Sequence, residues 1–246
     1  MDSASGTRFG SAAQTYHRLR PTPPRETVDW LLGADDVRSA VDFGAGTGLF
    51  TALLAERVRT VYAVEPDALM RARLTAHCPG VTVLDGTAEH LPLADGTVDA
   101  VASHSAWHWV DPEPAFAEIA RVLVPGGLLA VSWTMPDRRV GWRAKLDEIT
   151  GKTAEAGRGP GRFDVPPQTG FAIPEQYIHP WTMRMTVDDL VASLGTYDHV
   201  LGLSEPDRNS VLENCRTYLN GNPSTSRGII EVPFRTACFR THRVTD

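Results

Sequence analysis

Residues 42–48, with the sequence DFGAGTG, decide the fold. They follow an apolar run at residues 40–43, which is typical of a short buried strand. They precede apolar side chains at Phe50, Leu54 and Val58, whose spacing indicates a helix. Glycines let a backbone turn sharply and let a ligand approach closely. Since ligands of open α/β sheets bind outside the carboxyl ends of the strands, this loop predicts a ligand site.

Short apolar runs alternate with segments of helical period on both sides of this loop. The expected strands are residues 40–43, 61–65, 81–84, 98–103 and 128–133, and the expected helices are residues 26–32, 50–58, 67–76 and 112–123. For the last of these helices we expect Asp111 to act as the cap. Repeated alternation of strand and helix predicts an α/β fold whose parallel sheet has helices on both faces.

The pattern weakens after residue 133. Residues 151–180 are rich in glycine and proline, which predicts a surface insertion with little regular structure. Helices are expected at residues 187–194 and 207–219, and an antiparallel pair of strands at residues 229–234 and 236–243. We predict a single domain over residues 1–246. Its parts are the core at residues 24–134, a cover over 135–226 and terminal strands over 227–246.

Composition excludes several classes of protein. The chain has 246 residues, of which 42% are hydrophobic and 22% charged, with a formal net charge of −6. This acidic balance argues against a protein that neutralises nucleic-acid phosphates. No apolar run approaches the roughly 18 residues of a membrane span, and residues 1–14 lack a secretory signal. The scattered Cys78, Cys215 and Cys238 argue against a disulfide framework or a zinc site. We therefore expect a soluble, cytoplasmic protein.

Two acidic residues near the glycine loop restrict the class of ligand that the loop is able to bind. Glu65 ends the second expected strand, where a carboxylate is able to accept both hydroxyls of a ribose. The dinucleotide fingerprint requires Gly or Ala at position 49, which is Leu49 here. Asp42 would repel a pyrophosphate and attract a cation. The residues therefore favour a positively charged nucleoside over a dinucleotide.

Four segments resemble one family. Residues 41–48 (VDFGAGTG) resemble the first motif of class I S-adenosylmethionine (SAM) methyltransferases, residues 63–66 (AVEP) the second, and residues 86–93 (GTAEHLPL) the adenine loop. Residues 121–127 (RVLVPGG) are similar to the helix-to-strand turn of the type 11, small-molecule branch. The resemblance covers residues 38–134. It implies a Rossmann-like three-layer sandwich, with a seven-stranded, mostly parallel sheet and an antiparallel last strand.

The resemblance also implies the cofactor, SAM, and its contacts. Asp42, Gly44 and Gly46 are expected to line the methionine half, and Glu65 to hold the ribose. Many relatives carry Asp where Thr87 stands, so a backbone or hydroxyl contact to adenine is expected there. For Met70, helix packing is an equal alternative. The full set expected to bind SAM is Tyr16, Arg20, Asp42, Gly44, Ala45, Gly46, Glu65, Pro66, Met70, Thr87, Ala88, Glu89 and His104.

The N-terminal segment, residues 1–23, is expected to be a lid. In similar enzymes such a segment closes over SAM, and Tyr16 and Arg20 occupy matching places. An arginine is able to pair the SAM carboxylate through two parallel hydrogen bonds. The alternative is an exposed, solvated helix.

Residues 104–109 (HSAWHW) are the candidate acceptor site, because they follow the fourth strand and hold two indoles and two imidazoles. Aromatic faces stabilise a sulfonium or a cationic amine, and His104 or His108 is able to act as a general base near neutral pH. We expect Trp107, His108 and Trp109 to contact the acceptor. The alternative for the two tryptophans is packing beneath the helix at residues 112–123.

A second apolar set comes from the expected insertion and its surroundings: Phe163, Phe171, Tyr177, Trp181 and Met183. This set would either shape a hydrophobic substrate cavity or seal the insertion onto the domain.

The sequence predicts a SAM-dependent methyltransferase acting on an O, N or C nucleophile of a small, apolar or aromatic metabolite. We expect no metal, because only Asp137 follows the fifth strand, and no membrane partner; the protein is expected to be a monomer or homodimer. One alternative is a tRNA or other nucleic-acid methyltransferase, although residues 104–107 lack the D/N-P-P-Y/F stretch of enzymes that methylate base amines. A nicotinamide-dependent oxidoreductase and a non-enzymatic SAM-binding scaffold are the others.

Overall fold

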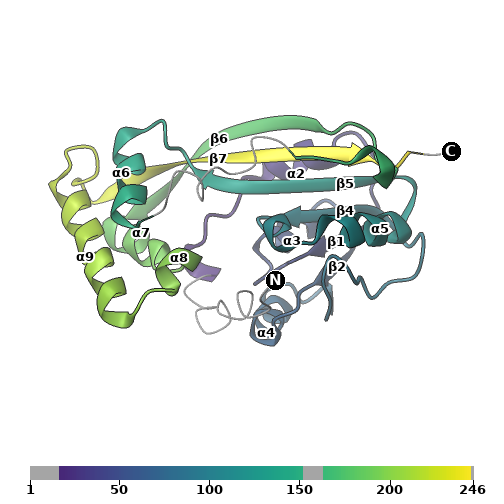
Figure 1. Cartoon of the computed structure of the whole chain (residues 1–246), viewed down its shortest axis with the longest axis horizontal. Coiled ribbons are helices and arrows are strands. Elements are labelled where there is room, and N and C mark those ends of the chain that lie inside the picture. The colour runs from purple at the N-terminus through teal and green to yellow at the C-terminus, as the bar shows by residue number, and fades with distance from the viewer. Residues whose placement is uncertain (1–16, 152–162, 245–246) are drawn as a thin grey trace. The chain divides into compact units, whose positions relative to one another are not determined.

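The structure is a computed structural model that describes residues 17–151 and 163–244 (Figure 1). Tyr16 lies outside the described residues, as does most of the expected lid. None of the described helices is both long and apolar enough to cross a membrane.

The sheet has the strand order β3-β2-β1-β4-β5-β7-β6. Its strands are β1 (Ser39–Phe43), β2 (Thr60–Val64), β3 (Thr82–Leu84), β4 (Val98–His104), β5 (Leu123–Pro136), β6 (Glu175–Thr186) and β7 (Ile229–His242). The pairs β1–β2, β1–β4, β2–β3 and β4–β5 are all parallel.

The last strand, β7, runs antiparallel to β5. The Arg243 N–H donates to the Gly127 carbonyl at 2.8 Å, while the Asp137 N–H donates to the Pro233 carbonyl at 3.0 Å. The partner on β7 thus moves backward as β5 moves forward, which is the antiparallel register. The predicted fold class, a seven-stranded, mostly parallel sheet with an antiparallel last strand, is confirmed.

The helices connect the strands much as their apolar spacing predicts. They are α2 (Arg25–Leu32), α3 (Leu49–Ala55), α4 (Ala68–His77), α5 (Pro112–Val122), α6 (Gly141–Ile149), α7 (Val187–Leu194), α8 (Asp198–Leu201) and α9 (Glu205–Gly221), with short 3₁₀ turns η2 (Trp107–Trp109) and η3 (Pro167–Thr169). The expected cap of α5 is wrong in one respect: Asp111 holds the cap position, but its side chain makes no capping hydrogen bond. Its backbone N–H instead donates to the Glu89 carboxylate at 2.8 Å.

Two expectations for the second half are corrected. Residues 229–234 and 236–243 form one strand, β7, because burial alternates without a break through Ile230, Val232 and Phe234 to Thr236. The end of the expected irregular insertion belongs to β6. This strand is mostly exposed, so it lacks an apolar pattern, and the edge of a sheet tolerates its Pro180.

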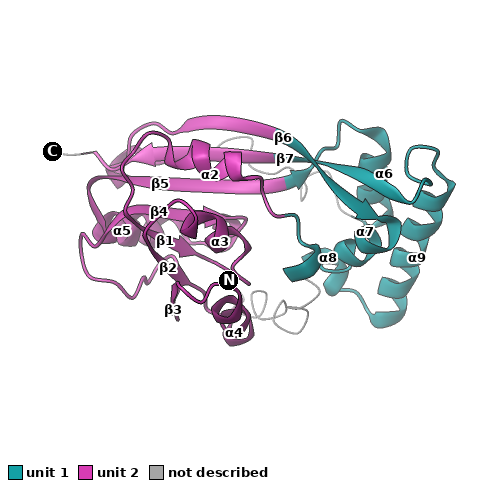
Figure 2. Cartoon of the chain, turned by 180° about the vertical axis from the view of Figure 1, so that it is seen from behind, with its two compact units in different colours: residues 1–21, 135–159, 180–235 teal, residues 22–134, 160–179, 236–246 magenta. Residues whose placement is uncertain are grey.

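The described chain gathers into two compact units (Figure 2). Unit 1 comprises Met1–Pro21, Met135–Gly159 and Pro180–Arg235, and unit 2 comprises Thr22–Thr134, Pro160–His179 and Thr236–Asp246. The single-domain organisation stays a prediction.

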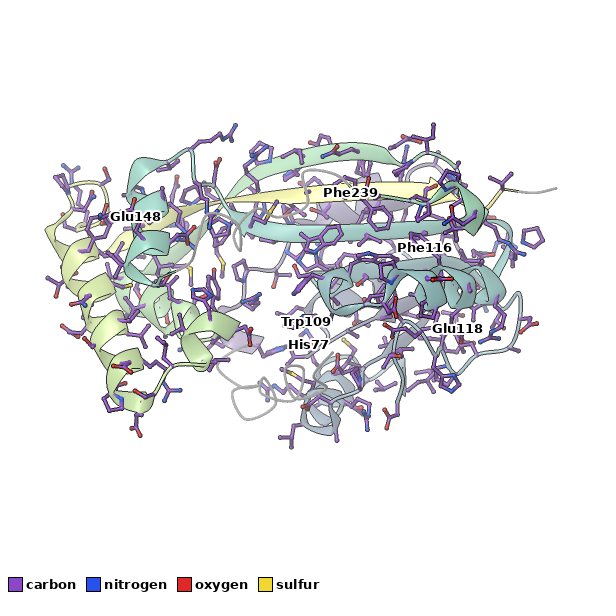
Figure 3. The ribbon with its side chains drawn as sticks, viewed as in Figure 1. His77, Trp109, Phe116, Glu118, Glu148 and Phe239 are labelled. Atoms are coloured by element: carbon purple, nitrogen blue, oxygen red, sulfur yellow. The ribbon has the colours of Figure 1, made fainter. Side chains whose placement is uncertain are left out.

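Unit 2 buries apolar side chains on both faces of its strands. Because successive strand residues point to opposite faces, Ala100 and Ala102 of β4 pack with Leu31 of α2 and Leu54 of α3. On the other face, Phe116 of α5 lies among aromatic rings that include Phe163 and Phe171 (Figure 3). These two layers hold the carboxyl ends of β1, β2 and β4, where the site residues lie.

Unit 1 has its own core, built by α6, α7 and α9 with the parts of β6 and β7 that belong to it. Its buried members are Leu146, Met185, Leu190, Val191, Leu194, Cys215, Leu219, Ile230, Val232 and Phe234. The helices at residues 187–194 and 207–219 are confirmed as α7 and the central part of α9.

Candidate active site

The glycine loop turns directly after β1. Gly44, Gly46 and Gly48 have φ angles of 61°, 58° and 88°, in the left-handed region that favours glycine. A Cβ on Gly44 would collide with the Cβ of Ala106, whereas a Cβ on Gly46 would meet no atom within 4 Å. The first glycine therefore allows close packing against the segment after β4. The second leaves an open backbone surface that a ligand is able to approach.

Asp42 lies beneath this loop, near the end of β1, with 1% of its surface exposed. Its Oδ2 accepts a hydrogen bond of 2.6 Å from the Thr51 hydroxyl, while its Oδ1 is buried and has no partner. Burial raises the Asp42 pKa to about 7; the Thr51 hydrogen bond opposes this shift and the nearby charge of Glu65 adds to it. A buried, unpartnered carboxylate oxygen is an acceptor suited to a cationic group such as an ammonium.

Glu65 follows β2 and joins two loops. Its Oε2 accepts the Gly46 N–H at 2.8 Å, and its Oε1 accepts the Asp67 N–H at 3.0 Å. Burial raises the pKa of this carboxyl, and the two backbone hydrogen bonds oppose the shift. Each carboxylate oxygen has a further lone pair, so the group retains acceptor capacity for hydroxyl donors such as those of a ribose.

The first turn of α4 carries the neighbours of Glu65. Asp67 caps this helix through its side chain, which accepts the Leu69 and Met70 N–H groups at 2.8 and 2.9 Å. Met70 is only 4% exposed, which favours its packing alternative, whereas Pro66 is exposed. Leu69 is 60% exposed and was missed by the sequence reasoning, because the helical pattern gives no signal that an apolar residue at this position faces outward.

The loop after β3 holds the predicted adenine contacts. Thr87 and His90 exchange backbone hydrogen bonds of 3.2 Å, which closes a tight turn. Thr87 is exposed and Ala88 is buried. The Glu89 carboxylate already accepts the Asp111 N–H, so this side chain links the loop to the start of α5.

His104 ends β4 and packs between two partners of unit 2. Its ring stacks on Phe50, with centroids 5.3 Å apart, and its Nδ1 lies 2.9 Å from the Ser132 hydroxyl oxygen. The next residue, Ser105, has a φ of 58° and was missed, since nothing in the sequence signals a left-handed serine. Strained backbone of this kind is common at functional sites, where the surrounding structure imposes it.

The turn η2 separates the two tryptophans. Trp107 packs against Phe43, Phe116 and Phe163, with ring centroids 4.9–5.9 Å away, so it serves as a packing anchor. Trp109 is 44% exposed (Figure 3), and its ring lies 4.7 Å from that of His108, which is also exposed. His108 and Trp109 are therefore the side chains of this turn that are accessible to an acceptor.

Arg20, the described one of the two predicted SAM contacts of the lid, belongs to unit 1. Its guanidinium carbon lies 5.0 Å from the centroid of the Tyr197 ring, a cation–π contact. The neighbouring Arg18 forms an exposed ion pair of 2.9 Å with Asp189, and Leu19 is buried. Residues 17–20 are thus attached to unit 1 rather than fully solvated. Closure over a cofactor stays a prediction.

The second apolar set is divided among separate contacts. Phe163 and Phe171 join the aromatic layer around Phe116, and Tyr177 stacks on Trp30 with centroids 5.5 Å apart. Trp181 stacks on Phe234 in unit 1 at 5.1 Å. These contacts favour sealing over a shared cavity for this set. Across residues 17–151 and 163–244, no group of three or more His, Cys, Asp or Glu side chains gathers as metal ligands would.

Comparison with known proteins identifies similar sequences and folds. Residues 41–131 match the model of a family described as a methyltransferase domain. An uncharacterized methyltransferase of Mycobacterium tuberculosis is 39% identical over 234 residues, which cover 94% of each chain. A malonyl-[acyl-carrier protein] O-methyltransferase of Methylococcus capsulatus is 37% identical over 62% of this chain and 60% of its own.

A solved structure has the same fold. A putative type II methyltransferase from Anaeromyxobacter dehalogenans superposes with a TM-score of 0.68 at 24% identity, covering 92% of this chain and 99% of its own.

Proposed function

We propose that this chain, which belongs to the class I SAM-dependent methyltransferases, methylates an O, N or C nucleophile of a small apolar or aromatic molecule. The observation that carries the proposal is the end of β4, where exposed His108 and Trp109 stand beside one another. An indole surface binds an apolar or aromatic body, and the imidazole is able to accept a proton from the nucleophile.

The glycine loop and the two acids fit SAM. The buried Oδ1 of Asp42 offers an acceptor for the ammonium group of the methionine half, and the bare surface at Gly46 accommodates the ligand's approach. We assign Glu65 the role of accepting the ribose hydroxyls, which its remaining lone pairs support. We assign the adenine contacts to Pro66, Leu69 and the turn at residues 87–89.

Bound SAM supplies a methyl group activated by its sulfonium for in-line displacement. The chain's own residues then orient the acceptor, exclude water and, where the nucleophile carries a proton, remove it. His104 is held by Ser132 and Phe50, which suits a positioning role, whereas the exposed His108 suits the role of base.

Names of relatives leave the acceptor atom open. The Methylococcus relative is named as an O-methyltransferase of malonyl-[acyl-carrier protein]. A structure from Thermotoga maritima with the same fold (TM-score 0.53, 22% identity) is titled a possible histamine N-methyltransferase. These names support oxygen and nitrogen as nucleophiles within the proposed class.

Binding measurements test the cofactor assignment. Calorimetry with SAM, S-adenosylhomocysteine and NAD is expected to show binding of the first two only. Binding of NAD alone would contradict the site's assignment and restore the nicotinamide alternative.

A product screen tests the acceptor class. The enzyme is incubated with SAM carrying a labelled methyl group, and with metabolite pools or total tRNA in separate reactions. We expect label in small molecules, detected by mass spectrometry. Label confined to tRNA would overturn the proposed acceptor, and binding of SAM without turnover in either pool would favour a scaffold.

We further propose that the protein acts in the cytoplasm without nucleic-acid or membrane partners; the net charge of −6 argues against a partner bound through its phosphates. We propose a monomer or homodimer, which light scattering of the purified chain distinguishes from larger assemblies.

A further inference from the structure

A fully buried arginine in unit 1 has unused hydrogen-bond donors. Arg143 lies in the first turn of α6 with 0% of its surface exposed. Its Nη1 lies 3.3 Å from Oδ1 of Asp147, but its Nε and Nη2 are buried and have no hydrogen-bond partner. A charged group rarely keeps buried donors unpaired, since each one has lost its hydrogen bonds to water.

The two unused donors lie on the same edge of the guanidinium. The N–H bonds of Nε and Nη2 point in parallel and match the two oxygens of a carboxylate side-on. Asp147 occupies the other side of the group, and its second oxygen also pairs with Arg138. Asp147 is therefore shared between two arginines and leaves the Nε–Nη2 edge unpaired.

The charges around Arg143 favour an anion. Within the described residues 137–147, Arg139 pairs with Asp137 at 2.6 Å, and the charge of Arg235 also acts on Asp137. Arg138 and Arg143 share Asp147, so this second group has two arginines for one aspartate, in a chain whose net charge is −6. Arg235 likewise has a buried Nε without a partner.

The neighbouring thiol does not balance this charge. Burial raises the pKa of Cys215 to about 11, against the smaller, lowering effect of Arg143. Cys215 is thus an uncharged thiol at neutral pH, and the excess positive charge is left for a ligand to neutralise.

We propose that unit 1 contains a carboxylate-binding site, in which the Nε–Nη2 edge of Arg143 binds a small organic acid side-on. The acid is a ligand distinct from the methyl acceptor, so this inference does not rest on the proposed function. Because Arg143 is fully covered, the side chains around it must move to admit the acid. The bound carboxylate is then enclosed, and the neutral amide of the same acid binds poorly.

The test compares acids with their amides on the purified full chain. Acetate, succinate, citrate, benzoate and octanoate, and the primary amide of each, are titrated in the presence and absence of SAM. Thermal shift and calorimetry give the readout. We expect at least one acid to bind and to raise the melting temperature, while its amide does neither.

Substitutions of Arg143 test whether its paired donors bind the acid. Arg143→Lys keeps the charge but loses the paired donors, so we expect binding of the acid to weaken at least tenfold. Arg143→Met, which removes the buried charge, provides a second variant should the lysine destabilise the fold. The matched control is Arg216→Lys in the same unit, where an exposed arginine pairs with Asp188 and Glu213; its affinity is expected to match the wild type.

The outcomes separate this inference from the proposed function. Absence of binding by every acid, or equal binding by wild type and both Arg143 variants, would overturn the carboxylate site, although SAM binding and methyl transfer to neutral acceptors would stand. An acid that binds is expected to stay unmethylated when SAM is present, which mass spectrometry checks; methylation of the bound acid would make it an acceptor and overturn this inference.

Discussion

The carboxyl ends of β1 and β2 differ from the carboxyl end of β4, although both belong to unit 2. At the first, Asp42 and Glu65 are buried and fixed by hydrogen bonds from Thr51, Gly46 and Asp67. At the second, His108 and Trp109 are exposed and their rings contact one another. A buried polar group needs defined partners, whereas an exposed aromatic turn tolerates change. We therefore expect the first region to set cofactor affinity and the second to set turnover and acceptor choice.

The largest effect is expected at Glu65. Glu65→Ala removes the proposed acceptor of two ribose hydroxyls, and hydrogen bonds to a charged group contribute about 1.5–3 kcal/mol each. The dissociation constant of SAM, measured by calorimetry, should rise on the order of 10²–10⁴-fold.

The matched control is Glu118→Ala. The Glu118 carboxylate also accepts a hydrogen bond of 2.7 Å from the backbone N–H of Leu91, and it forms an ion pair with Arg121. It should lose stability without losing SAM affinity. Wild-type affinity in Glu65→Ala would contradict the ribose role.

A substitution of His108 tests the expected role of the carboxyl end of β4 in turnover. If it acts as the base, His108→Ala should lower kcat about 10²-fold while the SAM dissociation constant stays unchanged. Stability should change by less than about 0.5 kcal/mol, since the side chain is exposed. His242→Ala, at another partly exposed histidine of unit 2, is the control. Lost cofactor affinity with normal turnover would make His108 a structural residue.

A smaller effect on SAM affinity is expected at Gly46, whose backbone surface is open. In Gly46→Ala, a Cβ fills the space left for the ligand, and we expect SAM affinity to fall about 30-fold. The strained φ also costs about 1–2 kcal/mol of folding free energy.

Gly96→Ala is a close control. Gly96 has a φ of 60°, and its Cβ would also meet no atom within 4 Å. Both variants should lose similar stability in urea titrations, and only Gly46→Ala should lose SAM affinity. Equal SAM affinities in the two would place the ligand elsewhere.

The raised pKa of Asp42 predicts that SAM affinity changes with pH by about tenfold. Its pKa is raised from 3.8 to about 7, so the folded protein holds this proton more tightly than the unfolded chain. Its contribution to stability is present below about pH 4 and is lost as the pH rises to about 7. Binding of the SAM ammonium favours the ionised form, so affinity should increase from pH 6 to pH 8.

Asp42→Asn should remove both trends. Asp99→Asn, in which the replaced acid has a lowered pKa, should leave the pH dependence of SAM binding intact. A pH-independent affinity in the wild type would show that Asp42 does not face the ammonium group.

The sequence predicted the glycine loop and the acid after β2 because their signals are local. Glycines 44 and 46 must adopt positive φ angles, and an acid must end the neighbouring strand, so residue type and spacing suffice. The alternation of apolar residues likewise predicted the parallel strands and α7. It failed for β6, since an exposed edge strand buries too few side chains to show a pattern.

Local patterns could not distinguish a packing residue from an exposed one in the segment after β4. Trp107 and Trp109 are two positions apart in a tryptophan-rich run, and only the packing of Phe116 and Phe163 against Trp107 distinguishes the anchor from the exposed ring. Similarly, the φ of 58° at Ser105 could not be predicted, because serine seldom adopts a positive φ.

The sequence by itself determined the fold class, the methyltransferase family and the positions of Asp42 and Glu65 beside the glycine loop, because these depend on backbone requirements within short stretches of chain. Only the tertiary structure decided that Asp42 keeps an unpartnered oxygen, that Trp109 is exposed, and that Arg143 is buried with two free donors. Burial and hydrogen-bond satisfaction depend on which distant residues cover a side chain, and no local pattern encodes that coverage.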